Sequence, residues 1–167
     1  RLVGPDGSIR AAWSQAASAP ANAAAPLLSL TCPLDRLEEP VFFLDLILSD
    51  SEGGPVAASR YVFTRAANLA PLLAVPSTTL DARREERGDA WTLAITNTGP
   101  QTALFVWLED GRAGAASGYA TFSANYVCLF PSETWNVTVG WHGAPPAERR
   151  VEISAWNAGQ QVITATA

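Results

Sequence analysis

The residues that could carry catalysis in this chain are few. His142 is its only histidine, so a Ser-His-Asp arrangement or a histidine-containing metal site would have to use it. It follows Trp141 at the end of an apolar alternation, and no nucleophile motif of the Gly-Xaa-Ser-Xaa-Gly type accompanies it. One histidine and two distant cysteines, Cys32 and Cys128, make no metal-ligand pattern. We therefore expect a solvated loop histidine, with no catalytic residue, metal site or cofactor site.

Carboxylates give no clearer signal for catalysis. A glycosidase needs two of them about 5 to 10 Å apart across a sugar-sized cleft. Glu109 and Asp110 are neighbours at the end of a predicted strand, so they diverge to opposite faces or enter solvent. Residues 81–86 alternate acidic and basic side chains, which is typical of a solvated edge strand. These patterns predict no catalytic pair within this chain.

Tryptophans are the strongest candidates for binding, because aromatic rings exposed on a β-sandwich can stack against sugars. The chain has six tryptophans. Trp107 alternates away from Val106, and Trp156 alternates away from Ile153, so these rings point outward or against a neighbouring domain. We name Trp107, Trp141 and Trp156 as candidates for contact with a sugar or a neighbouring domain, and the pattern leaves both readings open.

The composition is that of a folded chain with few classes of partner. Of the 167 residues 48% are hydrophobic and 16% are charged, far from the composition of a disordered chain. Sixteen acidic and eleven basic side chains form no basic track for a phosphate backbone, so no nucleic acid is expected. No apolar run approaches the roughly 20 residues that cross a bilayer, so no membrane is expected either.

One tripeptide bears on the cellular location of the chain. Asn136-Val137-Thr138 is an N-glycosylation sequon, which is used only in a secretory pathway. It predicts glycosylation at Asn136 and a protein that is secreted or held in the secretory, vacuolar or lysosomal pathway.

Period-two alternation bounded by Gly, Pro, Asn or Asp runs through the chain and predicts short antiparallel strands without helices. It stops between residues 66 and 77, where two prolines interrupt it, so we place a linker at 67–77. The segment 1–66 then holds too few strands for a sandwich and is expected to be the C-terminal part of one whose opening strands are missing. The segment 78–167 supplies a complete immunoglobulin-like sandwich, with a small barrel as the alternative. The strands are expected at 8–13, 27–31, 42–48 and 56–64, then at 79–85, 91–97, 103–109, 119–122, 127–130, 134–141, 149–156 and 161–166.

The alternation also assigns faces to side chains. Phe42, Leu44, Leu46 and Leu48 share one face, which we expect to be buried. Inward faces of the second domain are expected to hold Trp91, Leu93 and Ile95 on one strand, Val137 and Val139 on another, and Val151, Ile153 and Ala155 on a third. Asn136 and Thr138 then point outward, as a glycan requires.

Several stretches resemble the immunoglobulin-like domains that follow the catalytic barrel in glycoside hydrolase family 2, in the branch of β-mannosidases and exo-β-D-glucosaminidases. Among them the stretch from Asn125 to Glu133 is the most telling, although Ala124 and Ser132 stand where the family pattern has Asp and Gly. The resembling stretches are 42–50, 58–63, 93–99, 103–106, 122–133 and 151–157.

The resemblance implies a non-catalytic accessory part of a retaining glycosidase, including the endo-β-mannosidase type, which braces a catalytic (β/α)8 barrel. In the family the two catalytic glutamates belong to that barrel, so the chain alone is expected to be inactive while the whole protein is an enzyme. The barrel is then the expected partner, and an oligosaccharide is a second one. A carbohydrate-binding module and a cell-surface immunoglobulin-like structural domain remain the alternatives.

Overall fold

The computed structural model describes residues 1–18, 21–22, 24, 26–32, 37–66, 68–114 and 116–165. Within these residues the strands form three antiparallel four-stranded sheets, and the helical segments are two short 3₁₀ turns, η2 (Ala70–Ala74) and η3 (Pro146–Glu148). No helix in this part of the chain has the length and hydrophobicity needed to span a bilayer. The predicted all-β class is confirmed.

The chain divides into two compact units, Arg1–Ala74 and Val75–Ala167. The finer limits expected from the sequence, 1–66, 67–77 and 78–167, stay a prediction. Each unit is described by itself below.

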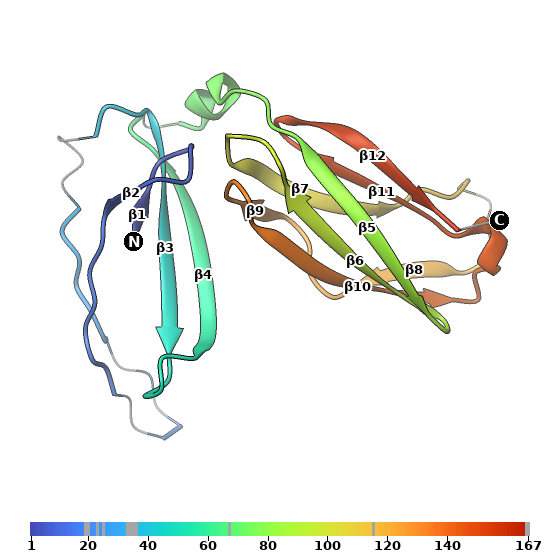
Figure 1. Cartoon of the computed structure of the whole chain (residues 1–167), viewed down its shortest axis with the longest axis horizontal. Helices are drawn as coiled ribbons and strands as arrows, with labels where there is room; N and C mark the ends of the chain where they lie inside the picture. The colour runs from blue at the N-terminus through green and yellow to red at the C-terminus, as the bar shows by residue number, and fades with distance from the viewer. Residues whose placement is uncertain are drawn as a thin grey trace. The chain divides into compact units, whose positions relative to one another are not determined.

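The first unit is one sheet in the order β2-β1-β3-β4 (Figure 1). Its two long strands are joined by a turn in which the amide of Asp50 donates to the carbonyl of Gly54, and Gly53 takes the positive φ of 86° that the turn requires. Its strands are β1 (Leu2–Val3), β2 (Ile9–Ala11), β3 (Val41–Ser49) and β4 (Pro55–Thr64).

A charged group is buried in this sheet. The carboxylate of Asp45 is 3% exposed. It accepts a hydrogen bond of 3.1 Å from Nε of Arg60, its cross-strand neighbour on β4, and it forms an ion pair with Arg1. A carboxylate at this depth is stable only with such partners, so the two arginines compensate the desolvation of Asp45.

The expected burial of one whole face of β3 is wrong. Phe42 is 5% exposed and packs with Leu2 and Leu37, but Leu46 is 38% and Leu48 is 50% exposed. Leu46 and Leu48 stay exposed because, among the described residues, no second layer covers them. The exposed face continues on β4, because the exposed Tyr61 lies opposite Leu44 of β3, which is only half-buried.

Residues 27–31, expected as a strand, are also different in the structure. They have irregular backbone. A short apolar run becomes a strand only when a neighbouring strand satisfies its backbone groups, and no paired strand is assigned to this run.

The second unit is a sandwich of two sheets, in the orders β5-β6-β10-β8 and β12-β11-β7-β9 (Figure 1). The inward faces are as predicted: Trp91, Leu93 and Ile95 are fully buried, and so are Val139 and Val151. The strands are β5 (Leu80–Arg87), β6 (Ala90–Asn97), β7 (Ala103–Asp110), β8 (Tyr119–Phe122), β9 (Val127–Leu129), β10 (Thr134–His142), β11 (Arg150–Ala155) and β12 (Ala158–Thr164).

Three asparagines join the ends of these strands through their side chains. Asn97 is fully buried; its Nδ2 donates to the carbonyls of Gln101 and Leu129, and its Oδ1 accepts from Thr78. Asn125 and Asn157 act in the same way on β7, where their Oδ1 atoms accept from the amides of Leu108 and Leu104. All three belong to stretches that resemble the family, and their contacts are with backbone and neighbouring side chains. Their role in this unit is structural.

We predict that Asn97→Ala destabilises the second unit by about 2–4 kcal/mol, because it leaves several buried polar groups without partners. Urea unfolding followed by tryptophan fluorescence measures this, since five of the six tryptophans lie in the second unit. The matched control, Asn136→Ala, removes an exposed amide and should change the free energy of unfolding by less than about 0.5 kcal/mol. Equal effects of the two substitutions would contradict the structural role.

The turn before β10 shows why the family pattern has glycine at the position of Ser132. Ser132 has a φ of 66°, the left-handed region that favours glycine, and it follows Pro131 as in a type II turn. Glu133 closes this turn, because its Oε2 accepts from the amide of Phe130 at 2.8 Å. The serine therefore occupies a position at which glycine is the less strained residue.

We expect Ser132→Gly to stabilise the second unit by up to about 1 kcal/mol. Glycine relieves the strain of the left-handed backbone, and part of this gain is offset because glycine makes the unfolded chain more flexible. For a domain of this size that is a rise in melting temperature of a few degrees, roughly 4–8 °C per kcal/mol. Ser132→Ala is the control and should bring no gain. A lower melting temperature for the glycine variant would refute the strain.

Candidate functional site

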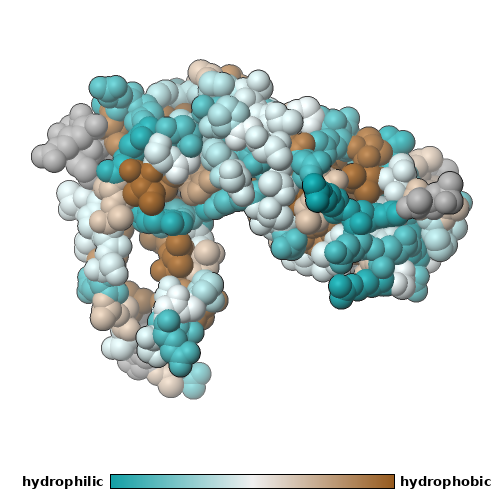
Figure 2. Space-filling model, viewed as in Figure 1, coloured by the Kyte–Doolittle hydropathy of each residue, from teal (hydrophilic) through white to brown (hydrophobic). Residues whose placement is uncertain are grey.

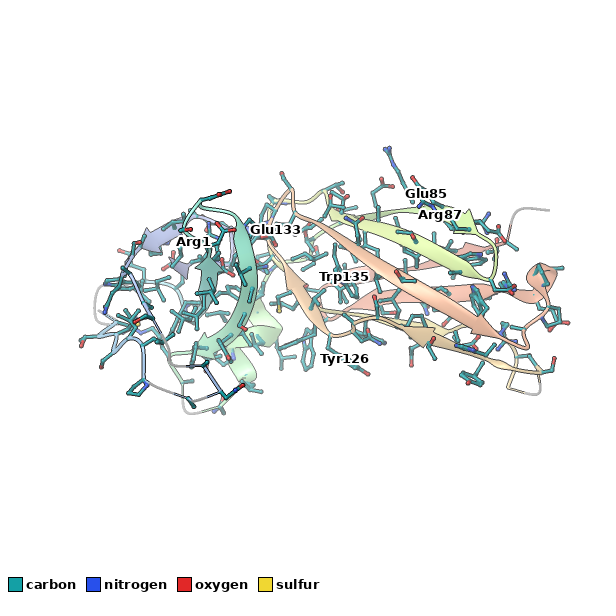
Figure 3. All side chains as sticks on the ribbon, turned by 90° about the horizontal axis from the view of Figure 1, so that it is seen from below. Arg1, Glu85, Arg87, Tyr126, Glu133 and Trp135 are labelled. Carbon is teal, nitrogen blue, oxygen red and sulfur yellow. The ribbon has the colours of Figure 1, made fainter. Side chains whose placement is uncertain are left out.

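The outer face of the β5-β6-β10-β8 sheet carries charge on its edge strand. On β5 the outward residues include Arg83, Glu85 and Arg87, and ion pairs of 3.4 Å join Arg83 to Asp81 and Arg87 to Glu85. Figure 3 shows Glu85 and Arg87 projecting from this strand, and Figure 2 shows hydrophilic residues gathered over the β5 and β6 side of the unit. The charged run of residues 81–86 is thus on an edge strand, as predicted.

His142 lies on the same sheet at the end of β10. Its ring stacks on Tyr119 with a centroid distance of 4.7 Å, and its Nε2 is 3.2 Å from the hydroxyl of Thr121. The hydrogen bonds of the described residues bring no carboxylate to this ring. A hydroxyl and an imidazole without an orienting acid do not make a catalytic triad.

Asn136 is exposed on the outer face of β10, opposite Ala94 of β6. Figure 3 shows the neighbouring Trp135 on this strand, where its side chain packs against the core. The orientation expected for Asn136 is therefore confirmed, and the glycan itself stays a prediction.

Trp141 belongs to the core of the second unit. Its ring is 4% exposed and meets Trp91 edge to face, with centroids 5.1 Å apart. The guanidinium groups of Arg112 and Arg149 lie 5.5 Å and 5.9 Å from its ring centroid. Each of these neighbours occupies ring surface that a sugar would need.

Arg112 is fixed over Trp141 by an ion pair with Asp110. Nη2 of Arg112 is 2.7 Å from Oδ2 of Asp110, and the amide of Ala120 also donates to that oxygen. The hydrogen bond from Arg112 lowers the pKa of Asp110 below its usual value of 3.8, and it outweighs partial burial, which acts in the opposite direction. This pair fastens the end of β7 to β8.

The outer face of the β12-β11-β7-β9 sheet holds the other two candidate tryptophans. Trp156 is 53% exposed and meets Phe105 edge to face, with centroids 6.2 Å apart. Trp107 is half-buried and lies opposite Ser154 of β11. The sugar or interdomain contact expected of Trp107, Trp141 and Trp156 stays a prediction, and the structure places only Trp107 and Trp156 on the surface.

Two carboxylates lie beside these rings, and the sequence did not predict that they are neighbours. Glu109 lies directly opposite Glu152 in the register of β7 with β11. The indole Nε1 of Trp107 donates to Oε2 of Glu109 at 3.1 Å. Glu152 is engaged on both oxygens, by Arg150 at 2.9 Å and by Gln160 at 2.7 Å. Alternation shows that these glutamates point outward, but the pairing of β7 with β11 cannot be read from the sequence.

This arrangement does not amount to a catalytic centre. Glu109 and Glu152 lie on the open outer face of a sheet, and Glu152 is neutralised by Arg150. Asp110 diverges from Glu109 toward Arg112, as expected of sequence neighbours. Among the described residues no group of His, Cys, Asp and Glu could hold a metal ion, and neither Cys32 nor Cys128 is in a disulfide. What this face offers is aromatic surface next to negative charge.

Comparison with protein families decides where the chain belongs. Residues 59–158, well over half of the chain, match the family described as the exo-beta-D-glucosaminidase Ig-fold domain. The chain belongs to this family. The immunoglobulin-like fold and the resemblance to the exo-β-D-glucosaminidase branch are therefore confirmed. Comparison with curated proteins gave no significant match.

Solved structures agree on the fold. The exo-chitosanase CsxA of Amycolatopsis orientalis is 19% identical, with a TM-score of 0.59. A variant of that enzyme in complex with PNP-beta-D-glucosamine is 22% identical, with a TM-score of 0.57. CsxA inhibited by a glucosamine-configured castanospermine and an amino-australine analogue is 20% identical, with a TM-score of 0.59. Each match covers 85% of this chain and 19% of the CsxA chain, so the chain spans about a fifth of these structures.

The ion pair of Asp110 with Arg112 makes stability depend on pH. Because the pKa of Asp110 is lowered in the folded state, its contribution is fully present above the usual value of 3.8 and is lost as the pH falls through the lower folded value. We predict that Asp110→Asn lowers the free energy of unfolding at pH 7 and that its deficit relative to the parent chain shrinks at acidic pH. Urea unfolding between pH 7 and pH 3 measures the deficit, and one that stays constant across this range would contradict the role of the pair.

Proposed function

We propose that this chain is a non-catalytic accessory part of a larger glycosidase of the exo-β-D-glucosaminidase or β-mannosidase type, and that it braces a catalytic (β/α)8 barrel. The observation that carries the proposal is the family match over residues 59–158, combined with the 19% share of the CsxA chain that this chain spans. The solved relatives are an exo-chitosanase and its complex with PNP-beta-D-glucosamine, which favours an amino-sugar substrate for the whole protein.

The open face of the first unit supports this proposal. Leu46, Leu48 and Tyr61 expose apolar surface, and a shallow hollow of about 110 Å³ is lined by Leu46, Leu48 and Ala57 together with Ala58 and Ser59. A sheet with an apolar face is stable when a second layer covers it. We infer that this layer comes from another part of the same glycosidase, which would attach the accessory part firmly to the enzyme.

We also propose that Asn136 is glycosylated and that the protein travels through a secretory pathway. The exposure of Asn136 on the outer face of β10 supports this, because a glycan can extend from it without disturbing the core.

The proposal that this chain is non-catalytic and that the activity belongs to the barrel is tested by assaying the purified chain and the native particle that contains it. We expect the 167-residue chain to hydrolyse neither an aryl β-glucosaminide nor an aryl β-mannoside, since no pair of free carboxylates faces a sugar-sized cleft in its described residues. The native particle should exceed the 17.7 kDa of the chain, contain a barrel polypeptide by peptide mass spectrometry, and hydrolyse one of the two substrates. Turnover by the chain alone, or a native particle that consists only of this chain, would overturn the proposal.

A further inference from the structure

We propose that the outer face of the β12-β11-β7-β9 sheet binds oligomers of a protonated amino sugar. The residues concerned are named here the aromatic-acidic face and comprise Phe105, Trp107, Glu109, Glu152 and Trp156. They come from β7, from β11 and from the turn that follows β11. The choice of an amino sugar among cationic ligands rests on the proposed function, whereas the site itself is argued from the second unit alone.

The aromatic part of this face is positioned rigidly. The backbone amide of Trp156 donates to the carbonyl of Leu104 at 2.9 Å, and its ring rests on that of Phe105. The ring of Trp107 is anchored through Nε1 to Glu109. Rings that are held before the ligand arrives lose little conformational freedom on binding, and the C–H faces of a sugar ring can stack against them.

The acidic part leaves one charge available. Like charges placed directly opposite on neighbouring strands repel, and here only Glu152 has a basic partner, Arg150. Glu109 accepts a hydrogen bond on Oε2 from Nε1 of Trp107, and within the described residues it forms no ion pair with a basic side chain. Its Oε1 therefore offers a carboxylate oxygen to a cation lying next to an aromatic ring.

The spacing of these residues suits a ligand that joins an apolar ring face to a positive charge. Along β7 the outward residues Trp107 and Glu109 are two positions apart, about 6.6 Å in a regular strand, whereas Phe105 has a positive φ of 49° and lies where the pairing of β7 with β9 is irregular. Trp156, Ser154 and Glu152 run beside them on the neighbouring chain segment, and β7 and β11 lie side by side in Figure 1. A chain of amino sugars presents ring faces and ammonium groups in the same repeating order.

Most sugars carry hydroxyl groups but no positive charge, and a positive charge is what Glu109 would bind. A neutral sugar could use the rings of Trp107 and Trp156 but would gain nothing from Glu109. An acidic sugar would be repelled by Glu109. The face is therefore expected to distinguish a glucosamine oligomer from its N-acetylated form, which has the same ring without the positive charge.

The test is a titration of the full 167-residue chain with a glucosamine tetramer and with the fully N-acetylated tetramer, at mildly acidic pH and low salt, by calorimetry and tryptophan fluorescence. Two substitutions probe the site, Trp156→Ala and Glu109→Gln. Their matched controls lie on the opposite sheet: Tyr119→Ala removes a ring that is 57% exposed, and Glu85→Gln removes an exposed carboxylate.

We expect the glucosamine tetramer to bind more tightly than the acetylated one, and more weakly as salt is added. Trp156→Ala should weaken binding of both tetramers about three- to tenfold, the range that loss of one aromatic contact gives. Glu109→Gln should weaken only the glucosamine tetramer, by about two- to fivefold, as for one exposed ion pair. Neither control should change either affinity.

Several results would overturn the site. They are equal affinities for the two tetramers, the absence of binding at millimolar concentrations, and an effect of Tyr119→Ala or Glu85→Gln as large as that of the site variants. Unfolding midpoints of all variants show whether the sandwich is intact, and Trp156→Phe, which keeps a ring, should restore most of the affinity lost in Trp156→Ala. Because this titration uses the chain alone, its failure is distinct from a failure to find a catalytic polypeptide in the native particle.

Discussion

The alternation of side chains along a β-strand is the constraint on which this structure depends. In the second unit two sheets bury their inward residues against each other, with Trp91, Leu93 and Ile95 of β6 at the centre. Burial of those positions determines where their sequence neighbours point. Trp107 and Glu109 face outward because Val106 and Leu108 face inward. The aromatic-acidic face is thus a geometric consequence of the core.

The stretches that identify the family serve this same core. Asn97, Asn125 and Asn157 bond backbone groups where strands end or bulge, and Glu133 closes the turn that leads into β10. Their side chains form hydrogen bonds with main-chain donors and acceptors that the hydrogen bonds between strands leave unpaired. These residues therefore carry information about the fold rather than about chemistry, which is consistent with a family defined by an immunoglobulin-like domain.

Much of this architecture could be predicted from the sequence, because alternation and turn residues are local signals. They gave the long strands of both units within a few residues, and the face of Asn136 on β10. Alternation also predicts the burial of Trp141, since it shares a face with Val137 and Val139, and this burial argues against Trp141 as a residue that contacts a sugar or a neighbouring domain. The left-handed turn at Ser132 agrees with the glycine of the family pattern.

What could not be predicted depends on partners distant in the sequence. The meeting of Glu109 with Glu152 requires the register between β7 and β11, which no local pattern specifies. The exposure of Leu46 and Leu48 was missed for the same reason, because an apolar strand face is buried only if another layer covers it. The error at residues 27–31 is similar, since a strand exists only as part of a paired sheet.

The second unit is a self-contained sandwich, whereas the first unit is a sheet with an apolar face open for a second layer. Amide hydrogen exchange on the 167-residue chain distinguishes the two units, because it reports the opening free energy of each strand separately. We expect the slowest exchange in β6, β10, β7 and β11, and much faster exchange around Leu46 and Leu48 in β3. Protection of those β3 amides equal to that of Leu93 and Val137 would show instead that the apolar face of the first unit is already covered.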